Sequence, residues 1–253
     1  IYTMMIIFGL KIEMPLLTIA YLMPHIIYTH DHFKGAKQDI LTNPERVKYF
    51  SASKKKNIFL LFVYITALAA FLLYLNNWRV DLAVAIITVS GLLYTDSLKG
   101  FSRQVSGFKN IFVALVWAAT ATILILLYYH LFFSFGLLLL FMFIFLRWLV
   151  NTIFFDIKDM IADSDSHIKT LPAISGKKAT INLLHFINIV SIAPIIVGVW
   201  LNILPYFSLC LLIFYFYSFY YLEKARAEKT NIHFLSYVLA DGEYILWPIA
   251  VYL

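Results

Sequence analysis

Three carboxylates follow one another at helical spacing between Asn151 and Pro172. Asp156, Asp159 and Asp163 lie three and four residues apart, and side chains at these separations share one face of a helix. Adjacent anions repel each other, and carboxylate oxygens are ligands that Mg²⁺ accepts when it bridges a protein to substrate phosphates. The stretch therefore predicts a site that needs a cation.

A second stripe of related residues lies in the loop at about 30–56. Asp31, Gly35 and Asp39 occupy positions i, i+4 and i+8 of one helical face, and the chain then turns at Pro44. If the two stripes converge, their oxygens hold Mg²⁺ together, and neighbouring Lys and Arg side chains clamp the phosphate oxygens. The alternative interpretation is that each stripe is only the solvated end of a helix.

The segments that must position these stripes are membrane helices. Of the 253 residues, 62% are hydrophobic and 13% are charged, which leaves too little polar surface for a soluble globule. We attribute the net charge of +6 to membrane topology and expect no nucleic-acid partner, and the single cysteine excludes an intramolecular disulfide. We expect an all-α, polytopic transmembrane helix bundle, each helix near the ~20 residues that a bilayer requires. The eight predicted segments are about 1–29, 57–77, 79–96, 110–129, 131–151, 180–202, 204–222 and 233–253.

Lys and Arg residues occur mainly in alternate connections between these segments. The connections after the first, third, fifth and seventh segments are basic, whereas the others hold only Arg79. Because basic loops stay in the cytoplasm, we expect the Asp-rich loops, at about 30–56 and 152–179, on the cytoplasmic side of a single membrane-embedded domain, 1–253. The chain starts at Ile1 without a basic leader, so we expect no signal peptide and a missing first stretch.

The charged blocks resemble motifs of the UbiA-type intramembrane prenyltransferases. FDIKDMIADSDSHIKTLP is similar to the second aspartate motif of that family, including the trailing Lys-Thr-Leu-Pro that starts at Lys169. The first loop resembles the motif Asn-Asp-x-x-Asp-x-x-x-Asp at Asp39 and the following Pro-x-Arg at Arg46. Between the loops, Tyr94 and Lys99 match a Tyr-x-x-x-Leu-Lys segment. The similarity in order and spacing covers nearly the whole chain.

Two features depart from this family pattern. The family has nine helices and carries its motifs after the second and sixth, whereas here they follow segments one and five. We therefore expect that the first helix of the pattern is missing from this sequence, with a natural eight-helix variant as the alternative. Gly35 stands where the first motif has its middle aspartate, and Asp31 stands where that motif has asparagine. The second motif is therefore the intact half of the expected site, and the first lacks one metal ligand.

The resemblance implies an Mg²⁺-dependent enzyme that transfers a prenyl group from an isoprenyl diphosphate to a hydrophobic acceptor. The acceptor is an aromatic quinone-type precursor or a lipid. A terpene cyclase of the same family, which needs no acceptor, and a non-enzymatic membrane binding or transport protein are the alternatives. The implied site comprises catalytic Asp159, Asp163, Lys99 and Tyr94, diphosphate-binding Arg46, Lys99, Lys169 and Arg103, and metal-binding Asp31, Asp39, Asp156, Asp159 and Asp163.

Other polar groups have simpler interpretations. Arg147 lies inside an apolar segment, where a charge is costly, and we weigh membership of the site against snorkelling or pairing with an aspartate. Asp241 and Glu243 are interpreted as interfacial residues at the start of the last segment. The tyrosines at 215–221 are interpreted as part of an interfacial aromatic belt.

Overall fold

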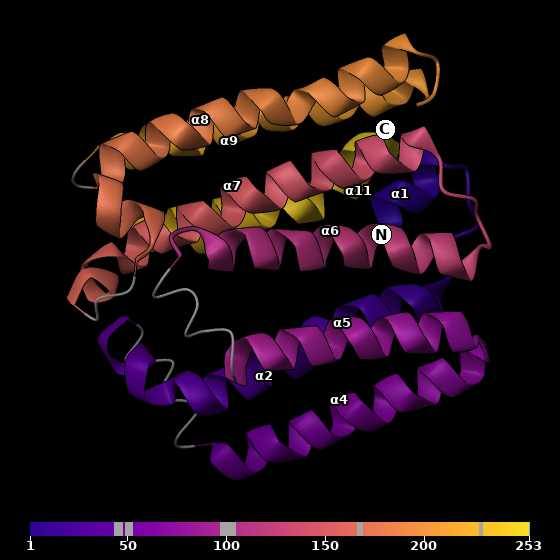
Figure 1. The fold of residues 1–253 in the computed structure, drawn as a ribbon, viewed down its shortest axis with the longest axis horizontal. Helices are drawn as coiled ribbons and strands as arrows, with labels where there is room; N and C mark the ends of the chain where they lie inside the picture. Colours follow the sequence, from indigo (N-terminus) through magenta and orange to yellow (C-terminus); the bar gives the residue numbers. More distant parts are fainter. Residues whose placement is uncertain (43–47, 49–52, 97–104, 166–168, 228–229, 253) are drawn as a thin grey trace. The chain divides into compact units, whose positions relative to one another are not determined.

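The computed structural model describes residues 1–42, 48, 53–96, 105–165, 169–227 and 230–252, with the side chains of 32, 34–42, 95, 96, 162 and 165 left aside. These residues form helices and no strand (Figure 1). Six helices among them are long and apolar enough to cross a membrane, which confirms the all-α, polytopic fold. In chain order the elements are α1 (Tyr2–Ile7), α2 (Met14–Thr42), α4 (Lys54–Leu75), α5 (Trp78–Asp96), α6 (Phe108–Tyr128), α7 (Phe135–Asp165), α8 (Leu171–Trp200), the 3₁₀ helix η2 (Tyr206–Leu212), α9 (Ile213–Arg226), α10 (Ile232–Phe234), the π-helical turn η3 (Leu235–Ala240) and α11 (Asp241–Tyr252).

The first apolar segment is divided between α1 and α2, so the expected continuous segment 1–29 is wrong. Gly9 has a φ of +61° just after α1, a conformation that ends helices and that glycine adopts without strain. Pro15 lies in the first turn of α2, where a missing N–H leaves no helical hydrogen bond unmade. Pro24 lies inside α2, as membrane helices allow.

One compact unit comprises Glu13–Gly100 and Ile123–Leu131. In it, α2 packs against both α4 and α5. The chain reverses between α4 and α5 at Asn76, whose φ of 46° lies in the left-handed region. The side-chain oxygen of Asn77 then accepts hydrogen bonds from the backbone N–H groups of Arg79 and Val80. This cap satisfies donors that the first turn of α5 cannot pair within the helix.

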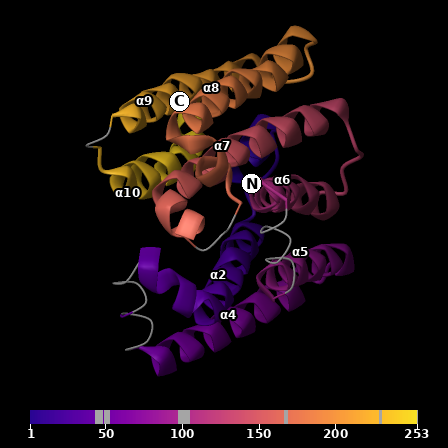
Figure 2. The same cartoon turned by 60° about the vertical axis from the view of Figure 1, so that its left-hand side comes forward.

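The other compact unit comprises Ile1–Ile12, Phe101–Thr122 and Phe132–Leu253. Helix α8 packs on α7 and on α9, η3 packs on α7, and α1 packs on α11; Figures 1 and 2 show α8 and α9 side by side. Apolar side chains from four of these elements make its core. The core residues are Val150, Ile153, Phe154, Ile157, Ile181, Leu184, Ile187, Tyr221, Leu222, Ala225, Leu235 and Ala240.

Two helices reach into the expected loop 152–179. Helix α7 continues beyond the predicted apolar segment as far as Asp165, and α8 already begins at Leu171. The aspartates of the second stripe are therefore helical, as their spacing predicted. Gly176 has φ 80° and ψ 162° and kinks α8 after its first turns, because these angles are incompatible with a helix and strained for residues that carry a Cβ.

Candidate functional site

Asp156 is fully buried, and both of its carboxylate oxygens accept hydrogen bonds from α6. Oδ1 lies 2.8 Å from Lys109 Nζ, and Oδ2 lies 2.8 Å from Asn110 Nδ2. The Lys109 side chain is 43% exposed, so the buried carboxylate is compensated by a cation that also reaches solvent. These charge-assisted bonds fix the register of α7 against α6 at the start of the carboxylate stripe.

Asp159, one turn further along α7, has one paired and one unpaired oxygen. Oδ2 lies 2.6 Å from the Nζ of Lys158. Oδ1 is buried and has no hydrogen-bond partner among the described residues. Because a buried carboxylate oxygen without a partner is costly and rare in folded proteins, this atom is the clearest available ligand for a cation in the stripe.

Lys158 is itself nearly buried, with a side chain that is only 5% exposed. Its ammonium lies 5.8 Å from the ring centroid of Phe155 and 5.6 Å from that of Tyr237. The two rings meet edge to face at 5.4 Å. Aromatic faces attract cations at these distances, so the lysine is held between two rings and the carboxylate of Asp159. Sequence reasoning counted Lys158 only as one basic residue of a loop.

Asp163 is half-buried at the outer end of the stripe, and its pKa is raised from 3.8 to about 6. Burial is the main cause, because it disfavours the charged form. The ammonium of Lys109 lowers this pKa, whereas the negative charges of Asp156 and Asp159 raise it. The carboxylates therefore share one electrostatic environment that lacks sufficient positive charge, as three anions on one helical face should.

The remaining predicted residues belong to other parts of the chain. Lys169 is exposed just before α8, and Asp31 and Tyr94 are partly buried in the other compact unit. Asp39 belongs to α2, but its side chain is not among those that the structure describes. Three other predicted residues lie wholly outside the described part of the chain: Arg46, Lys99 and Arg103. Within the described part of the chain, no group of three His, Cys, Asp or Glu residues is arranged to hold a metal ion. Convergence of the two stripes stays a prediction.

Arg147 does not snorkel, and its partner is not an aspartate. The side chain is 1% exposed and donates to Glu243 through Nε, at 2.8 Å, and through Nη2, at 2.5 Å. It also donates to Asn188 and Ser218. Glu243 is 2% exposed, so its interfacial interpretation is wrong: the carboxylate is buried because it is the counterion of a buried guanidinium.

The tyrosines at 215–221 do not act together as an interfacial belt. Tyr221 is 1% exposed and packs against Phe154 in the core, whereas Tyr220 is 55% exposed. Helical periodicity explains the difference, because consecutive residues point to different sides of α9. Asp241, by contrast, is exposed and accepts a hydrogen bond from Asn151 at 3.1 Å, and its interfacial position stays a prediction.

Comparison with known proteins yields one match. The model of the UbiA prenyltransferase family matches residues 16–239, which is most of the chain and includes both aspartate stripes. No significant match was found to a curated protein or to a solved structure.

Proposed function

Because the chain belongs to the UbiA prenyltransferase family, we propose that it transfers a prenyl group from an isoprenyl diphosphate to a hydrophobic acceptor within the membrane. An aromatic quinone-type precursor and a lipid are the acceptor classes. The observation that carries the proposal is the buried, unpaired Oδ1 of Asp159, beside the carboxyl of Asp163 with its raised pKa. A divalent cation would give the unpaired oxygen of Asp159 a partner and would favour the charged form of Asp163.

The proposed cofactor is Mg²⁺, with Asp159 and Asp163 as the ligands that this helix contributes. When bound, Mg²⁺ supplies positive charge to the diphosphate leaving group. Asp156 has both oxygens engaged by α6, so its proposed part is to hold the stripe in place and to supply negative charge. Lys158 keeps Asp159 in one orientation through its 2.6 Å contact.

The other half of the proposed site is the first stripe with its neighbouring cations. Asp31 and Asp39 complete the set of metal ligands in this proposal, although Gly35 provides no carboxylate between them. Tyr94 orients the diphosphate or faces the allylic cation, whose charge an aromatic ring stabilises. The residues proposed to clamp the diphosphate are Arg46, Lys99, Arg103 and Lys169.

The test is release of diphosphate by the detergent-purified full chain, incubated with prenyl diphosphates of several lengths, with and without Mg²⁺. We expect magnesium-dependent release that falls about 100-fold or more in Asp159→Asn, the scale of losing one group that stabilises developing negative charge. Glu223→Gln is the matched control, because Glu223 is an exposed carboxylate that pairs with Arg226. Equal rates in wild type and Asp159→Asn would show that the proposed site is wrong.

Product analysis separates the alternatives. A prenylated acceptor identifies a transferase, whereas a hydrocarbon or alcohol formed without any acceptor identifies a cyclase. Failure to bind prenyl diphosphate at all identifies a non-enzymatic membrane protein. Gly35→Asp adds a further comparison, since a restored carboxylate strengthens magnesium binding only if the first stripe takes part in the site.

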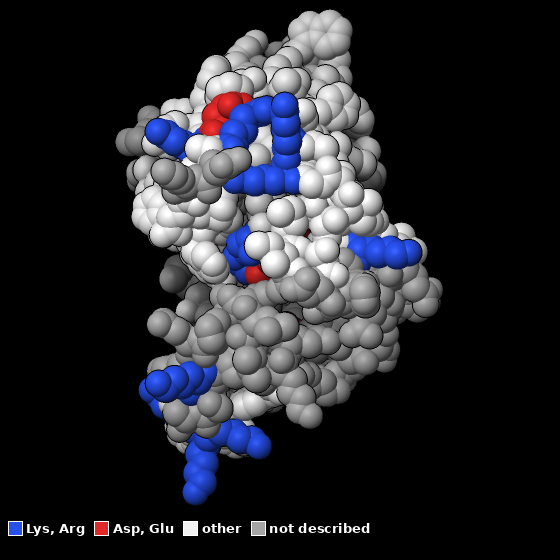
Figure 3. All heavy atoms as spheres, turned by 90° about the vertical axis from the view of Figure 1, so that its left-hand side faces the viewer, with Lys and Arg blue, Asp and Glu red and all other residues white. Residues whose placement is uncertain are grey.

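We also propose that the connections bearing the aspartates face the cytoplasm. The basic residues of the alternate connections support this orientation; among the residues that the structure describes, Figure 3 shows several Lys and Arg side chains and fewer Asp and Glu. The test starts from Cys210→Ser, which removes the single cysteine. In that background Lys55→Cys should react with a membrane-impermeant maleimide only after cells are opened, and Phe132→Cys should react in intact cells.

A further inference from the structure

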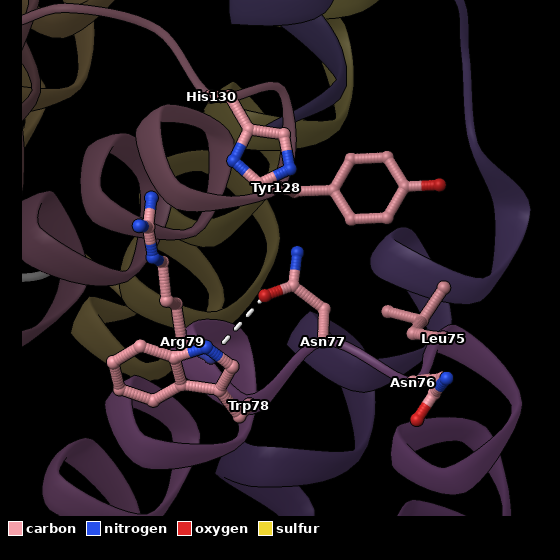
Figure 4. Close-up of a pocket in the computed structure, with 7 residues that line it drawn as sticks. All are labelled: Leu75, Asn76, Asn77, Trp78, Arg79, Tyr128 and His130. Carbon is pink, nitrogen blue, oxygen red and sulfur yellow. Dashed lines mark hydrogen bonds between the residues drawn. The ribbon is translucent and has the colours of Figure 1, made fainter.

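A polar pocket of about 510 Å³ lies in the compact unit that comprises Glu13–Gly100 and Ile123–Leu131 (Figure 4). It is formed where α4 turns into α5 and where α6 ends. These connections alternate along the chain with those that carry the aspartate stripes, so the pocket belongs to the opposite membrane surface. The lining residues with polar side-chain atoms are Asn76, Asn77, Trp78, Arg79, Tyr128 and His130.

The pocket has an excess of positive charge. Arg79 is the one Lys or Arg among the residues that line the pocket, and its guanidinium carbon lies 5.7 Å from the ring centroid of Trp78. No acidic residue lines the pocket, and none of the described carboxylates forms an ion pair with Arg79. Asp81 is two residues further along α5, and residues at this separation do not face each other.

The donors of the pocket converge on one space. Asn77 uses its side-chain oxygen to accept the N–H groups of Arg79 and Val80, at 3.2 and 3.4 Å, which leaves its amide nitrogen as a donor. Figure 4 shows this nitrogen, the Arg79 guanidinium and the His130 ring around the same space. His130 has a φ of 52°, and this left-handed turn places the ring beyond the end of α6.

We propose that this pocket binds the phosphate group of an anionic lipid headgroup. A guanidinium and an amide donor match phosphate oxygens, and the N-terminus of α5 adds the positive end of its helix dipole. We assign the phosphate group to a lipid because the pocket lies at a membrane surface and because apolar side chains lie beside it. Leu73 and Tyr74, just before the turn, are 80% and 75% exposed, and they offer a surface for acyl chains.

The proposal is independent of the proposed prenyl transfer, and its test is binding. The full chain in a neutral detergent is titrated with phosphatidylglycerol, with phosphatidylcholine and with inorganic phosphate, and complexes are counted by intact-protein mass spectrometry. We expect wild type to retain one phosphatidylglycerol in preference to phosphatidylcholine. Arg79→Gln should weaken this binding about tenfold or more, as loss of a charge-assisted hydrogen bond predicts, whereas Arg79→Lys should retain most of it.

Two controls keep the result specific. Lys55→Gln removes one exposed positive charge near the other end of α4 and should leave the preferred phosphatidylglycerol bound. His130→Ala removes a donor contributed by a different helix end and should weaken binding independently of Arg79. Circular dichroism of each variant verifies that the helices are intact, and only folded variants are compared.

The outcomes distinguish the phosphate source. If wild type binds inorganic phosphate, Arg79→Gln does not, and wild type shows no preference for phosphatidylglycerol, then the pocket is an anion site but its ligand is not a lipid. Equal retention of phosphatidylglycerol by wild type and Arg79→Gln would overturn the proposal, and so would the absence of any preferential binding by wild type.

Discussion

Replacing Glu243 with leucine should destabilise the unit that contains α7, α8, α9 and α11 by about 3–5 kcal/mol, the usual cost of leaving a buried charge without its partner. The magnitude follows from the contacts of the carboxylate. Its oxygens accept two hydrogen bonds from Arg147, one from Ser218 at 2.9 Å and one from Trp247 at 3.2 Å. All of these donors are buried, so no water replaces the lost acceptor.

Arg147→Leu should be similarly harmful, because it leaves the carboxylate of Glu243 buried without a cation. The double variant should cost at least about 2 kcal/mol less than the sum of the two single variants, since neither charge then remains. Glu223→Leu is the control: this glutamate is 40% exposed and contacts both Arg226 and His185, and such partly exposed pairs contribute about 0–1 kcal/mol each.

The assay is thermal unfolding in detergent, followed by circular dichroism. For a chain of this size, 3–5 kcal/mol corresponds to a fall in Tm of about 6–20 °C. The reasoning is refuted if the effects of Glu243→Leu and Arg147→Leu are additive in the double variant. It is also refuted if Glu243→Leu lowers Tm no more than Glu223→Leu does.

Three further changes test other parts of the structure. If Asp163 is the magnesium ligand that we propose, Mg²⁺ should bind more tightly as pH rises through about 6, because the charged form of this carboxyl, whose pKa is about 6, coordinates the ion. Isothermal titration calorimetry between pH 5 and 7 should show this gain, and Asp163→Asn should abolish it. Asn110→Ala should destabilise the fold by about 1–3 kcal/mol, since it leaves an oxygen of buried Asp156 unpaired, and Tm measures this loss. Gly198→Ala should cost about 1–3 kcal/mol through overpacking, again measured by Tm, because its Cβ would lie 2.5 Å from Leu204 Cδ1.

Matched variants control these comparisons. Asp241→Asn changes an exposed carboxylate and should leave the pH dependence of magnesium binding unchanged. Gly242→Ala introduces the same methyl group as Gly198→Ala, but the nearest atom to that Cβ would be the Tyr217 hydroxyl oxygen at 3.7 Å. A Tm loss in Gly242→Ala equal to that in Gly198→Ala would contradict the packing explanation. Wild-type stability in Asn110→Ala would show that the bond to Asp156 contributes nothing.

Local spacing was sufficient to predict the helical stripe on α7, since three and four residues determine a common face whatever surrounds the helix. The environment of its members was not predictable in this way. Lys158 lies against Tyr237, which comes from η3 much further along the chain, and the unpaired oxygen of Asp159 depends on that packing. The kink of α8 at Gly176 was not predictable either, because glycine permits a positive φ but does not require it.

The buried pair shows the same limit. An arginine inside an apolar segment predicts that a counterion exists, but Arg147 and Glu243 are 96 residues apart. Only the packing of α7, α8, α9 and α11 brings this glutamate to the arginine. The break after α1 was more accessible from the sequence, because Gly9, Lys11 and Glu13 interrupt the apolar run within a few residues. Conversely, the order of the charged blocks was sufficient to identify the family that the comparison shows.

The separation of Arg147 from its counterion along the chain has a consequence for the synthesis of the protein. At about 5–20 residues per second, a ribosome needs roughly 5–20 s to add the 96 residues between them. During that interval α7 enters the membrane with a guanidinium whose carboxylate does not yet exist. Because a charge is costly inside a membrane, α7 gains its charged partner only when α11, the last described helix along the chain, has been synthesised.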